Sequence, residues 1–276
     1  MHTEPRDILR KTDHRPYPLP SAPWIMRETW SKVLLAHWPL PPTLIRPLLP
    51  PHLELDTFAQ EAYISVLAFR MSGVRLRFLP PIPGANQMIQ INIRTYVNRD
   101  DKPGIYFLAV DSNHLLTVLL TRLALGLPYH HAVITLKNRF VGYKSTLECI
   151  SQRLDTTDSQ SFPKEAEEHR GEMSRPGGAL QVSYSPSSDV WHARSGSLEH
   201  WLTERYCLYG FHASKLLRVD IHHHPWPLHT AEAEFRRQSL LSPLQNQLGF
   251  DLTATPLLVH YAERIDALIW LPTAVE

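Results

Sequence analysis

Residues 90–97 read Gln90-Ile91-Asn92-Ile93-Arg94-Thr95-Tyr96-Val97, with polar and apolar or β-branched side chains in alternation. Successive side chains of a β-strand point to opposite faces. The alternation therefore predicts a strand with Gln90, Asn92, Arg94 and Tyr96 on one face. Two amides, an arginine and a phenol can bind and orient a polar ligand. The same pattern also fits a strand face that is simply solvated.

Strand signals dominate the chain on both sides of this segment. Alternating or β-branched runs occupy residues 62–71, 88–97, 105–111, 132–150, 179–184, 216–222 and 257–270. Apolar residues at helical spacing, with capping residues before some of them, predict helices over 27–35, 113–125 (capped by Asn113), 197–209 and 230–248, and a short helix from Pro42. Long runs of strands with a few inserted helices predict an α+β fold, mainly an antiparallel β-sandwich or cone-shaped barrel with peripheral helices.

The predicted domain organisation is simple. Residues 1–25 are rich in proline and charge and are expected to form an extended arm, and residues 26–276 are expected to form a single domain. The stretch 154–178 is polar and lacks periodicity, which predicts a mobile loop within that domain.

Composition limits the possible functions. The 276 residues carry a formal net charge of +1, so we expect no nucleic-acid partner. The N-terminus lacks the apolar core of a signal peptide, and the longest apolar runs are far shorter than a membrane-spanning helix. The two cysteines, Cys149 and Cys207, form no C-x-x-C motif and are expected to be buried and inert. These features predict a soluble, cytoplasmic protein without a membrane partner.

Several catalytic motifs are missing from the sequence. There is no G-x-S-x-G, no P-loop and no G-x-G-x-x-G, so serine-hydrolase and nucleotide-binding classes lack support. The run His222-His223-His224 has no partner pair such as H-E-x-x-H, and a histidine group held by hydrogen bonds is the better interpretation. We therefore expect no metal and no cofactor. Glu204 could act as a general acid or base, although a structural ion pair is the alternative.

Several blocks of sequence resemble a known family. They include Ala36-His37-Trp38-Pro39, Asn92-Ile93-Arg94-Thr95-Tyr96-Val97, Gly196-Ser197-Leu198-Glu199-His200 and Ile221-His222-His223-His224-Pro225-Trp226, and the matching blocks together span about residues 30–271. The chain resembles the YqjF-type family of uncharacterised bacterial proteins in the acetoacetate decarboxylase-like superfamily. That resemblance implies one antiparallel β domain, a sandwich or cone-shaped barrel that encloses a pocket, with helices packed outside.

The resemblance also implies which chemistry has been lost. Decarboxylases of the superfamily use a lysine that forms a Schiff base with a keto acid, and a second lysine lies next to it. The corresponding turn here is Gly126-Leu127-Pro128-Tyr129-His130-His131, which places Tyr129 and His130 where those lysines would stand. A carboxylate of the relatives is replaced by Gln90. Without the amine, the Schiff-base mechanism has no nucleophile.

Three functional hypotheses follow. The first is a pocket for a small carbonyl or carboxylate ligand in which Arg94 pairs with an oxygen atom, Gln90, Asn92 and Tyr96 orient the ligand, and Arg70 lies at the rim. The second is a lyase, dehydratase or isomerase in which Tyr129, His130 or Glu204 transfers protons. The third is an interaction protein whose cavity is packed shut. A homo-oligomer is compatible with all three hypotheses.

Overall fold

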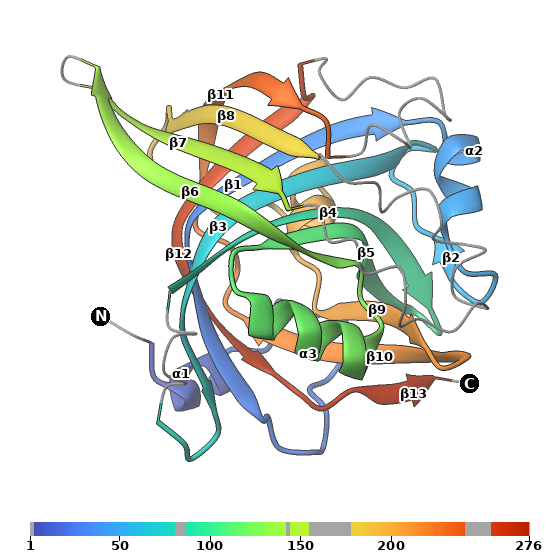
Figure 1. The fold of residues 1–276 in the computed structure, drawn as a ribbon. Helices are drawn as coiled ribbons and strands as arrows, with labels where there is room; N and C mark the ends of the chain where they lie inside the picture. Colours follow the sequence, from blue (N-terminus) through green and yellow to red (C-terminus); the bar gives the residue numbers. More distant parts are fainter. Residues whose placement is uncertain (1–2, 81–86, 142–143, 155–177, 241–254, 276) are drawn as a thin grey trace.

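The computed structural model describes residues 3–80, 87–141, 144–154, 178–240 and 255–275, and most of them lie in strands (Figure 1). In this part of the chain, β12 pairs with both β10 and β1 and so closes seven strands into a barrel. The barrel strands, in their order around the ring, are β1 (Met26–Leu40), β3 (Ala62–Leu76), β4 (Gln87–Arg99), β5 (Lys102–Ser112), β9 (Cys207–His212), β10 (Lys215–His223) and β12 (Leu258–Ile269).

A second sheet packs over the outer face of the barrel (Figure 1). It contains β6 (Tyr129–Val141), β7 (Lys144–Arg153), β8 (Ala179–Pro186) and β11 (Leu228–Gln238), and it joins the barrel at β5 and β12. Two short strands, β2 (Glu54–Leu55) and β13 (Thr273–Val275), extend the edges. The described ladders are antiparallel except β5–β6 and β5–β9. The predicted α+β class, mainly antiparallel with peripheral helices, is confirmed, and the parallel pairings are additions to it.

The barrel and the second sheet create two separate cores. One core lies between them and includes Ile93 from β4, Leu136 from β6 and Cys149 from β7. The other lies inside the barrel, where Leu35, Leu67, Tyr96 and Phe107 contribute to it. Strand β4 is buried on both faces, so its two sets of alternating side chains enter different cores.

The helices lie at the periphery. A short helix α2 (Pro42–Ile45) and a 3-10 turn (Arg46–Leu48) follow β1, as the prolines there predict. Helix α3 (Leu115–Leu125) connects the parallel strands β5 and β6 on the outside of the molecule (Figure 1). Its N-cap is His114, whose ring accepts the Thr117 amide at 3.3 Å. The predicted cap, Asn113, instead accepts the amide of Ile89 at 2.8 Å.

The helix predicted over residues 27–35 is wrong, because this segment lies in the 15-residue strand β1. Both Leu34 and Leu35 are fully buried, since the strand is covered on its outer face by the second sheet and on its inner face by the barrel core. A strand buried on both faces loses its alternation, and a short apolar run then fits helical spacing by coincidence.

Of two further predicted helices, one is wrong over its described residues and the other is too long. In the segment 230–248, residues 230–238 belong to β11, where burial alternates along the strand, and residues 241–248 lie outside the described part. In the segment 197–209, helix α5 (Leu198–Thr203) ends early and β9 begins at Cys207. In both places pairing with neighbouring strands overrides helical spacing.

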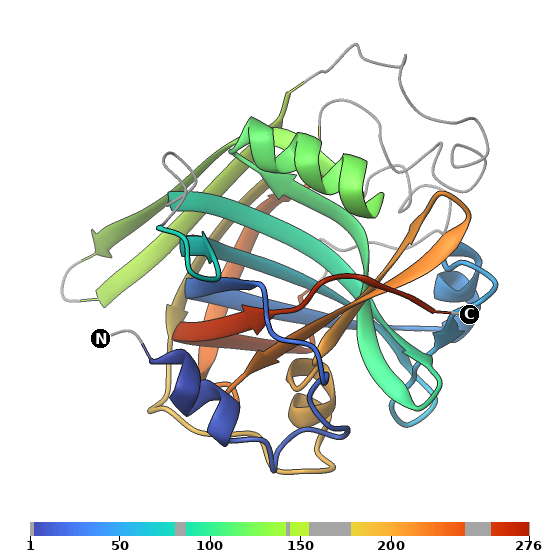
Figure 2. The ribbon, with the colours of Figure 1, turned by 90° about the horizontal axis from the view of Figure 1, so that it is seen from below.

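The first 25 residues are not wholly extended. They contain helix α1 (Pro5–Arg10), which places Ile8 against Leu268 and Trp270 and lies beside the ends of β10 and β12 (Figure 2). The predicted mobile loop at 154–178 falls almost entirely outside the described residues. Among the helices that are described, none is long and apolar enough to cross a membrane.

Candidate functional site

The polar face of β4 forms part of the inner wall of the barrel. Gln90, Asn92, Arg94 and Tyr96 are each at most 6% exposed, and Tyr96 belongs to the core inside the barrel. The intervening side chains of Ile91, Ile93 and Val97 point instead toward the second sheet. The four residues of the predicted polar face are therefore brought together on one buried wall.

A chain of hydrogen bonds crosses three neighbouring strands beside this wall. The Ser65 hydroxyl on β3 lies 2.6 Å from Nδ1 of His37 on β1 and 2.6 Å from the Tyr96 hydroxyl on β4. Burial, with smaller contributions from His260 and Arg94, lowers the pKa of His37 well below its usual value. The ring is therefore neutral at pH 7 and can both donate and accept a hydrogen bond. Neither His37 nor Ser65 was predicted to be a site residue, because the pairing of strands cannot be inferred from a single sequence.

Arg94 has an unusual environment for a buried cation. One of its nitrogens, Nη2, donates to the carbonyl of Leu202 at 3.3 Å, while Nε has no hydrogen-bond partner in the described part of the chain. Burial lowers the pKa of this arginine; Tyr96 opposes the shift, and the nearby Arg205 adds a smaller lowering. Among the described residues, no carboxylate forms an ion pair with Arg94. A buried cation in this state is unfavourable unless an anion joins it.

Other polar atoms of the inner wall also lack partners within the described residues. They come from β4, β1, β12 and the segment after β10, and they are Asn92 Oδ1, His37 Nε2, His260 Nδ1 and Trp226 Nε1. His260 and His37 are neighbours, with ring centroids 5.6 Å apart. Buried polar groups are nearly always hydrogen-bonded in folded proteins. A ligand that carries both donors and acceptors would satisfy these atoms.

A second polar group lies around Gln90. Its amide donates to the Tyr129 hydroxyl at 3.1 Å, and the carboxylate of Glu28 is close enough to contribute to the raised pKa of Tyr129, which burial mainly causes. Glu28 accepts a 2.7 Å hydrogen bond from the Trp30 indole, and burial raises its pKa to about 7. Glu28 therefore supplies a buried, protonatable carboxyl group. It was missed because the segment was predicted to be a helix.

Two of the predicted site residues lie elsewhere. His130 follows Tyr129 on β6 and so points to the opposite face, where burial, with smaller contributions from Arg153 and Arg122, lowers its pKa well below the usual value. Arg70 is exposed, and its guanidinium donates to the carbonyl of Leu136 on the second sheet at 3.3 Å. Both residues obey the two-residue period of a strand, which places them on the side away from the inner wall. Neither joins Arg94.

A cavity of about 700 Å³ lies beside α5 and the N-terminal segment. Lys11, Arg15, His200 and Trp201 line it together with Glu204 and Arg205, but the four polar residues of β4 do not. Trp201 separates the two regions, because its ring lies 4.6 Å from that of Tyr96. The Arg205 guanidinium covers the Trp201 ring at 4.3 Å and pairs with Asp56 at 2.5 Å.

Glu204 stands at the end of α5 and faces this cavity. It accepts hydrogen bonds from the Tyr206 hydroxyl and, at 3.0 Å, from the Trp226 amide. Burial raises its pKa above the usual value, although both hydrogen bonds oppose the shift. The structural ion pair predicted as the alternative role of Glu204 is not found among the described residues, where Glu204 is instead a hydrogen-bonded carboxyl group. Such a group can exchange a proton with a molecule in the cavity.

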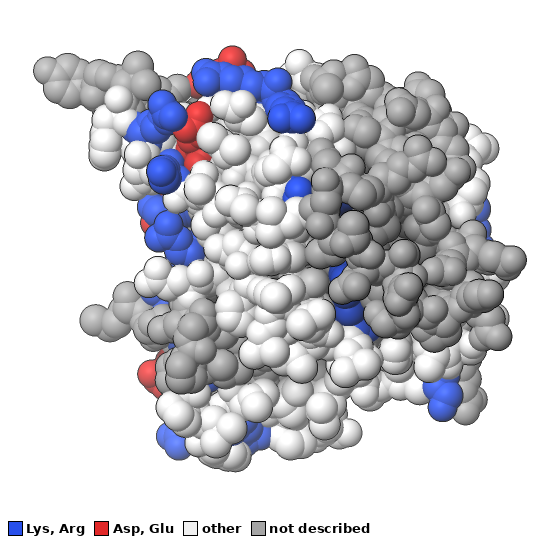
Figure 3. Space-filling view, in the orientation of Figure 1, with Lys and Arg blue, Asp and Glu red and all other residues white. Residues whose placement is uncertain are grey.

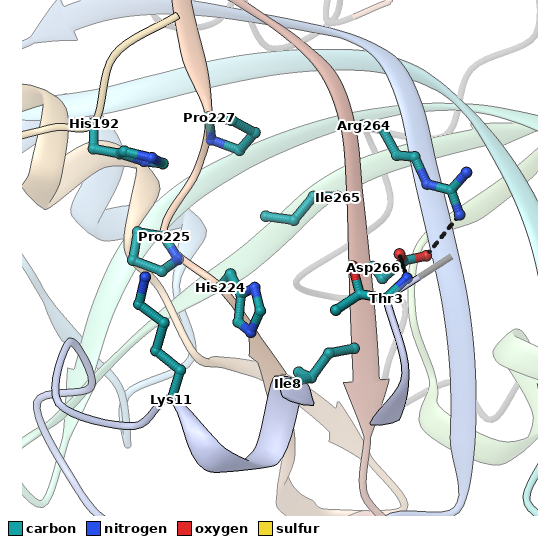
Figure 4. A pocket seen from close by; sticks show the side chains of 10 residues that line it. All are labelled: Thr3, Ile8, Lys11, His192, His224, Pro225, Pro227, Arg264, Ile265 and Asp266. Carbon is teal, nitrogen blue, oxygen red and sulfur yellow. Dashed lines mark hydrogen bonds and ion pairs between the residues drawn. The ribbon is translucent and has the colours of Figure 1, made fainter. Parts of the chain in front are cut away.

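A smaller pocket of about 300 Å³ lies next to α1 and β12 (Figure 4). It shares Lys11, His192 and Pro225 with the larger cavity. Figure 4 shows the Lys11 side chain extending toward Pro225, with His224 nearby. The carbonyls of Ile8 and Asp7 lie 2.9 Å and 3.2 Å from Nε2 of His222 and His224, respectively. These histidines hold the N-terminal segment in place, and the described residues contain no group of three or more potential metal ligands.

Comparison with known proteins fits this architecture. Residues 27–266 match the family of uncharacterized conserved proteins called DUF2071, and the chain is 40% identical over 252 residues to the uncharacterized protein YqjF of Bacillus subtilis. That alignment covers 91% of this chain and 93% of YqjF. The chain belongs to the DUF2071 family. The descriptions of the family and of YqjF name no activity.

Solved structures with the same fold have much lower sequence identity. The enduracididine biosynthesis enzyme MppR aligns with a TM-score of 0.57 at 12% identity, covering 92% of this chain and 89% of MppR. An acetoacetate decarboxylase-like enzyme from Sphingomonas wittichii aligns with a TM-score of 0.55 at 13% identity, covering 92% and 94% of the two chains. Acetoacetate decarboxylase from Legionella pneumophila aligns with a TM-score of 0.52 at 14% identity, covering 98% and 95%. The chain therefore adopts an acetoacetate decarboxylase-like fold.

Proposed function

We propose that this protein binds a small anionic molecule, a carboxylate that also carries a carbonyl group, on the inner wall of its barrel. The observation that carries the proposal is the buried Arg94, which lacks a carboxylate partner among the described residues. An incoming carboxylate would supply the missing charge and satisfy the planar donor group of the guanidinium. Asn92, Tyr96 and Gln90 would orient the rest of the ligand.

The ligand would enter from the 700 Å³ cavity beside α5. Trp201 and Arg205 lie between this cavity and Tyr96, so entry requires these two side chains to move aside. The carbonyl that Arg94 contacts belongs to Leu202, in the same helix. A small displacement of α5 would therefore open the path and release the guanidinium at the same time.

The proposed binding does not involve a Schiff base. Tyr129 faces the barrel interior, and the resemblance to decarboxylases implies a lysine at this position in those enzymes. None of the lysines of this chain whose side chains are described is buried. Lys11 lines both cavities but is exposed to solvent. An exposed amine lacks the buried, apolar surroundings that turn a lysine into a nucleophile. We propose a cytosolic location with no nucleic-acid, metal or cofactor requirement, in keeping with two buried free cysteines and a net charge of +1.

A second candidate function is proton transfer to the bound molecule, as in a lyase, dehydratase or isomerase. It is favoured by Glu204, which combines a raised pKa with a place in the cavity wall. A carboxyl group with a raised pKa can act as a general acid when it is protonated, and its conjugate base can then accept a proton. Tyr129 and Glu28 could play the same part deeper in the barrel.

A screen of small carboxylates, including 2-oxo and 3-oxo acids, by thermal shift and native mass spectrometry would test the proposal. Arg94→Ala should weaken binding of any hit by about 100-fold or more, since it removes a buried charge-assisted contact. Arg70→Ala is the matched control, because Arg70 lies on the adjacent strand but points away from the wall. Undiminished affinity in Arg94→Ala would refute this binding site.

The same hit would separate binding from catalysis. Following it by NMR in the presence of the protein should show no change for a binding protein, whereas turnover that Glu204→Gln abolishes would establish the second candidate. Borohydride treatment with a keto acid should leave the intact mass unchanged, and a stable adduct would contradict the absence of Schiff-base chemistry. A screen without any Arg94-dependent ligand would favour a packed interior in a protein that acts through its surface.

A further inference from the structure

Helix α3 carries its leucines on the outside of the molecule. Leu115, Leu116, Leu119, Leu120 and Leu123 are between 48% and 76% exposed, and of the eleven helical residues Val118 is the one that is buried. The single charged residue of the helix, Arg122, is held by the Tyr129 carbonyl at 2.5 Å. We call the five leucines the leucine face.

This arrangement is the reverse of an ordinary surface helix, whose apolar stripe packs on the core and whose polar residues face water. Five leucines exposed to this degree present an apolar area on the order of 500 Å², near the upper end of the largest patches found on monomeric proteins. Figure 3 shows the surface over α3 almost free of charged side chains, which lie mainly at the margins of this view.

We propose that the leucine face is the contact surface of a homodimer in which α3 packs antiparallel against α3 of a second copy. A twofold contact brings the same patch together with itself, so a patch that carries charge of one sign would repel its copy. The leucine face has no such charge. Leu116, Leu120 and Leu123 follow the four-then-three spacing that allows side chains of two helices to interlock.

The apolar area of the leucine face is also compatible with a second copy of the chain. Two leucine faces would together bury on the order of 1,000 Å², which reaches the lower limit of specific protein–protein interfaces. A lipid surface is a poorer match, since helices that lie on membranes usually carry several lysines or arginines on the flanks of the apolar face. In α3 the single arginine is engaged with a backbone carbonyl.

The test is the oligomeric state of the full chain. Light scattering after size exclusion should give twice the chain mass at tens of micromolar concentration. In the double variant Leu119→Glu with Leu123→Glu, the dissociation constant should rise at least tenfold, to a monomer at the same concentration. Leu271→Glu is the control, because Leu271 is 62% exposed outside α3. A monomeric wild-type chain, or a dimer that survives the double substitution, would overturn the proposal.

A crosslink would locate the contact independently of stability. Leu120 lies near the middle of α3, so Leu120→Cys should form a disulfide across the twofold axis on mild oxidation, whereas Leu271→Cys should not. The native Cys149 and Cys207 are at most 1% exposed and should not react. Circular dichroism would verify folding of each variant. If the wild type is monomeric and binds phosphatidylcholine–phosphatidylglycerol vesicles through these leucines, the face serves a membrane and the dimer proposal fails.

Discussion

Each of the two cores contains a buried arginine, and the two arginines differ in whether a carboxylate pairs with them. Between the barrel and the second sheet, Arg153 on β7 pairs with Asp111 on β5 at 2.7 Å, and both side chains are at most 3% exposed. Inside the barrel, Arg94 is almost as deeply buried but has a carbonyl as its partner instead of a carboxylate. Arg153, which lies between the barrel and the second sheet, therefore has a carboxylate as its counter-charge. Arg94, on the wall where we propose that a ligand binds, has none among the described residues.

The largest effect is expected on the paired arginine. Arg153→Met would leave Asp111 buried without its cation, and breaking a buried pair in this way costs about 3–5 kcal/mol of unfolding free energy. Urea denaturation at pH 7 would measure the loss. The control is Arg236→Met, which removes an exposed pair with Glu234 and should produce no measurable change. A small loss in Arg153→Met would show that the Asp111 pair is not structural and would remove the contrast.

A pH-dependent effect of intermediate size is expected from Glu28. Its pKa is raised from 4.5 to about 7 in the folded state, so its contribution to stability is complete below pH 4.5 and is lost as pH rises through 7. The difference between these pKa values corresponds to on the order of 3 kcal/mol. Glu28→Gln stays neutral, so its stability relative to wild type should increase between pH 4.5 and pH 8.

Denaturation of both proteins across this pH range would measure the effect, and subtraction cancels the other titrating groups that the two share. A constant difference between Glu28→Gln and wild type would mean that the Glu28 carboxyl ionises normally. In that case it could not act as a proton donor near neutral pH.

The sequence predicted one face of the inner wall correctly for a physical reason. A two-residue period is a local property, and it is enough to place Gln90, Asn92, Arg94 and Tyr96 together on β4. The partners of these residues are set by the register between strands. His37 contacts Ser65, which is 28 residues away in the chain, and Ser65 contacts Tyr96, which is 31 residues away. No local sequence pattern records such contacts.

The errors also have a common cause. Strand β1 is covered on both faces, so its residues Leu34 and Leu35 are both apolar and the alternation that identifies a strand disappears. The incorrect helix hid Glu28 from consideration. Arg70 and His130 were wrongly grouped with the site, by sequence proximity and by resemblance respectively. The two-residue period of their strands directs both side chains to the face away from the inner wall.

The smallest effect on stability, and the most informative one, is expected from Arg94→Met. Because the guanidinium is buried without a carboxylate, replacing it by an apolar side chain of similar length should leave the unfolding free energy unchanged or raise it by about 1–2 kcal/mol. Urea denaturation without ligand would measure this directly against Arg153→Met. A loss as large as that of Arg153→Met would mean that Arg94 is a structural residue and that the inner wall is simply a packed core.

Addition of a ligand would complete the contrast between the two arginines. A ligand that binds only the folded state stabilises it by about 2.7 kcal/mol at a concentration of 100 times its dissociation constant. The wild type should gain this stability and Arg94→Met should not. With ligand, the unfolding free energy of the wild type should therefore equal or exceed that of Arg94→Met, whereas without ligand it should be equal or lower. Arg153→Met should gain as much as the wild type from its lower starting point, since its arginine belongs to the other core.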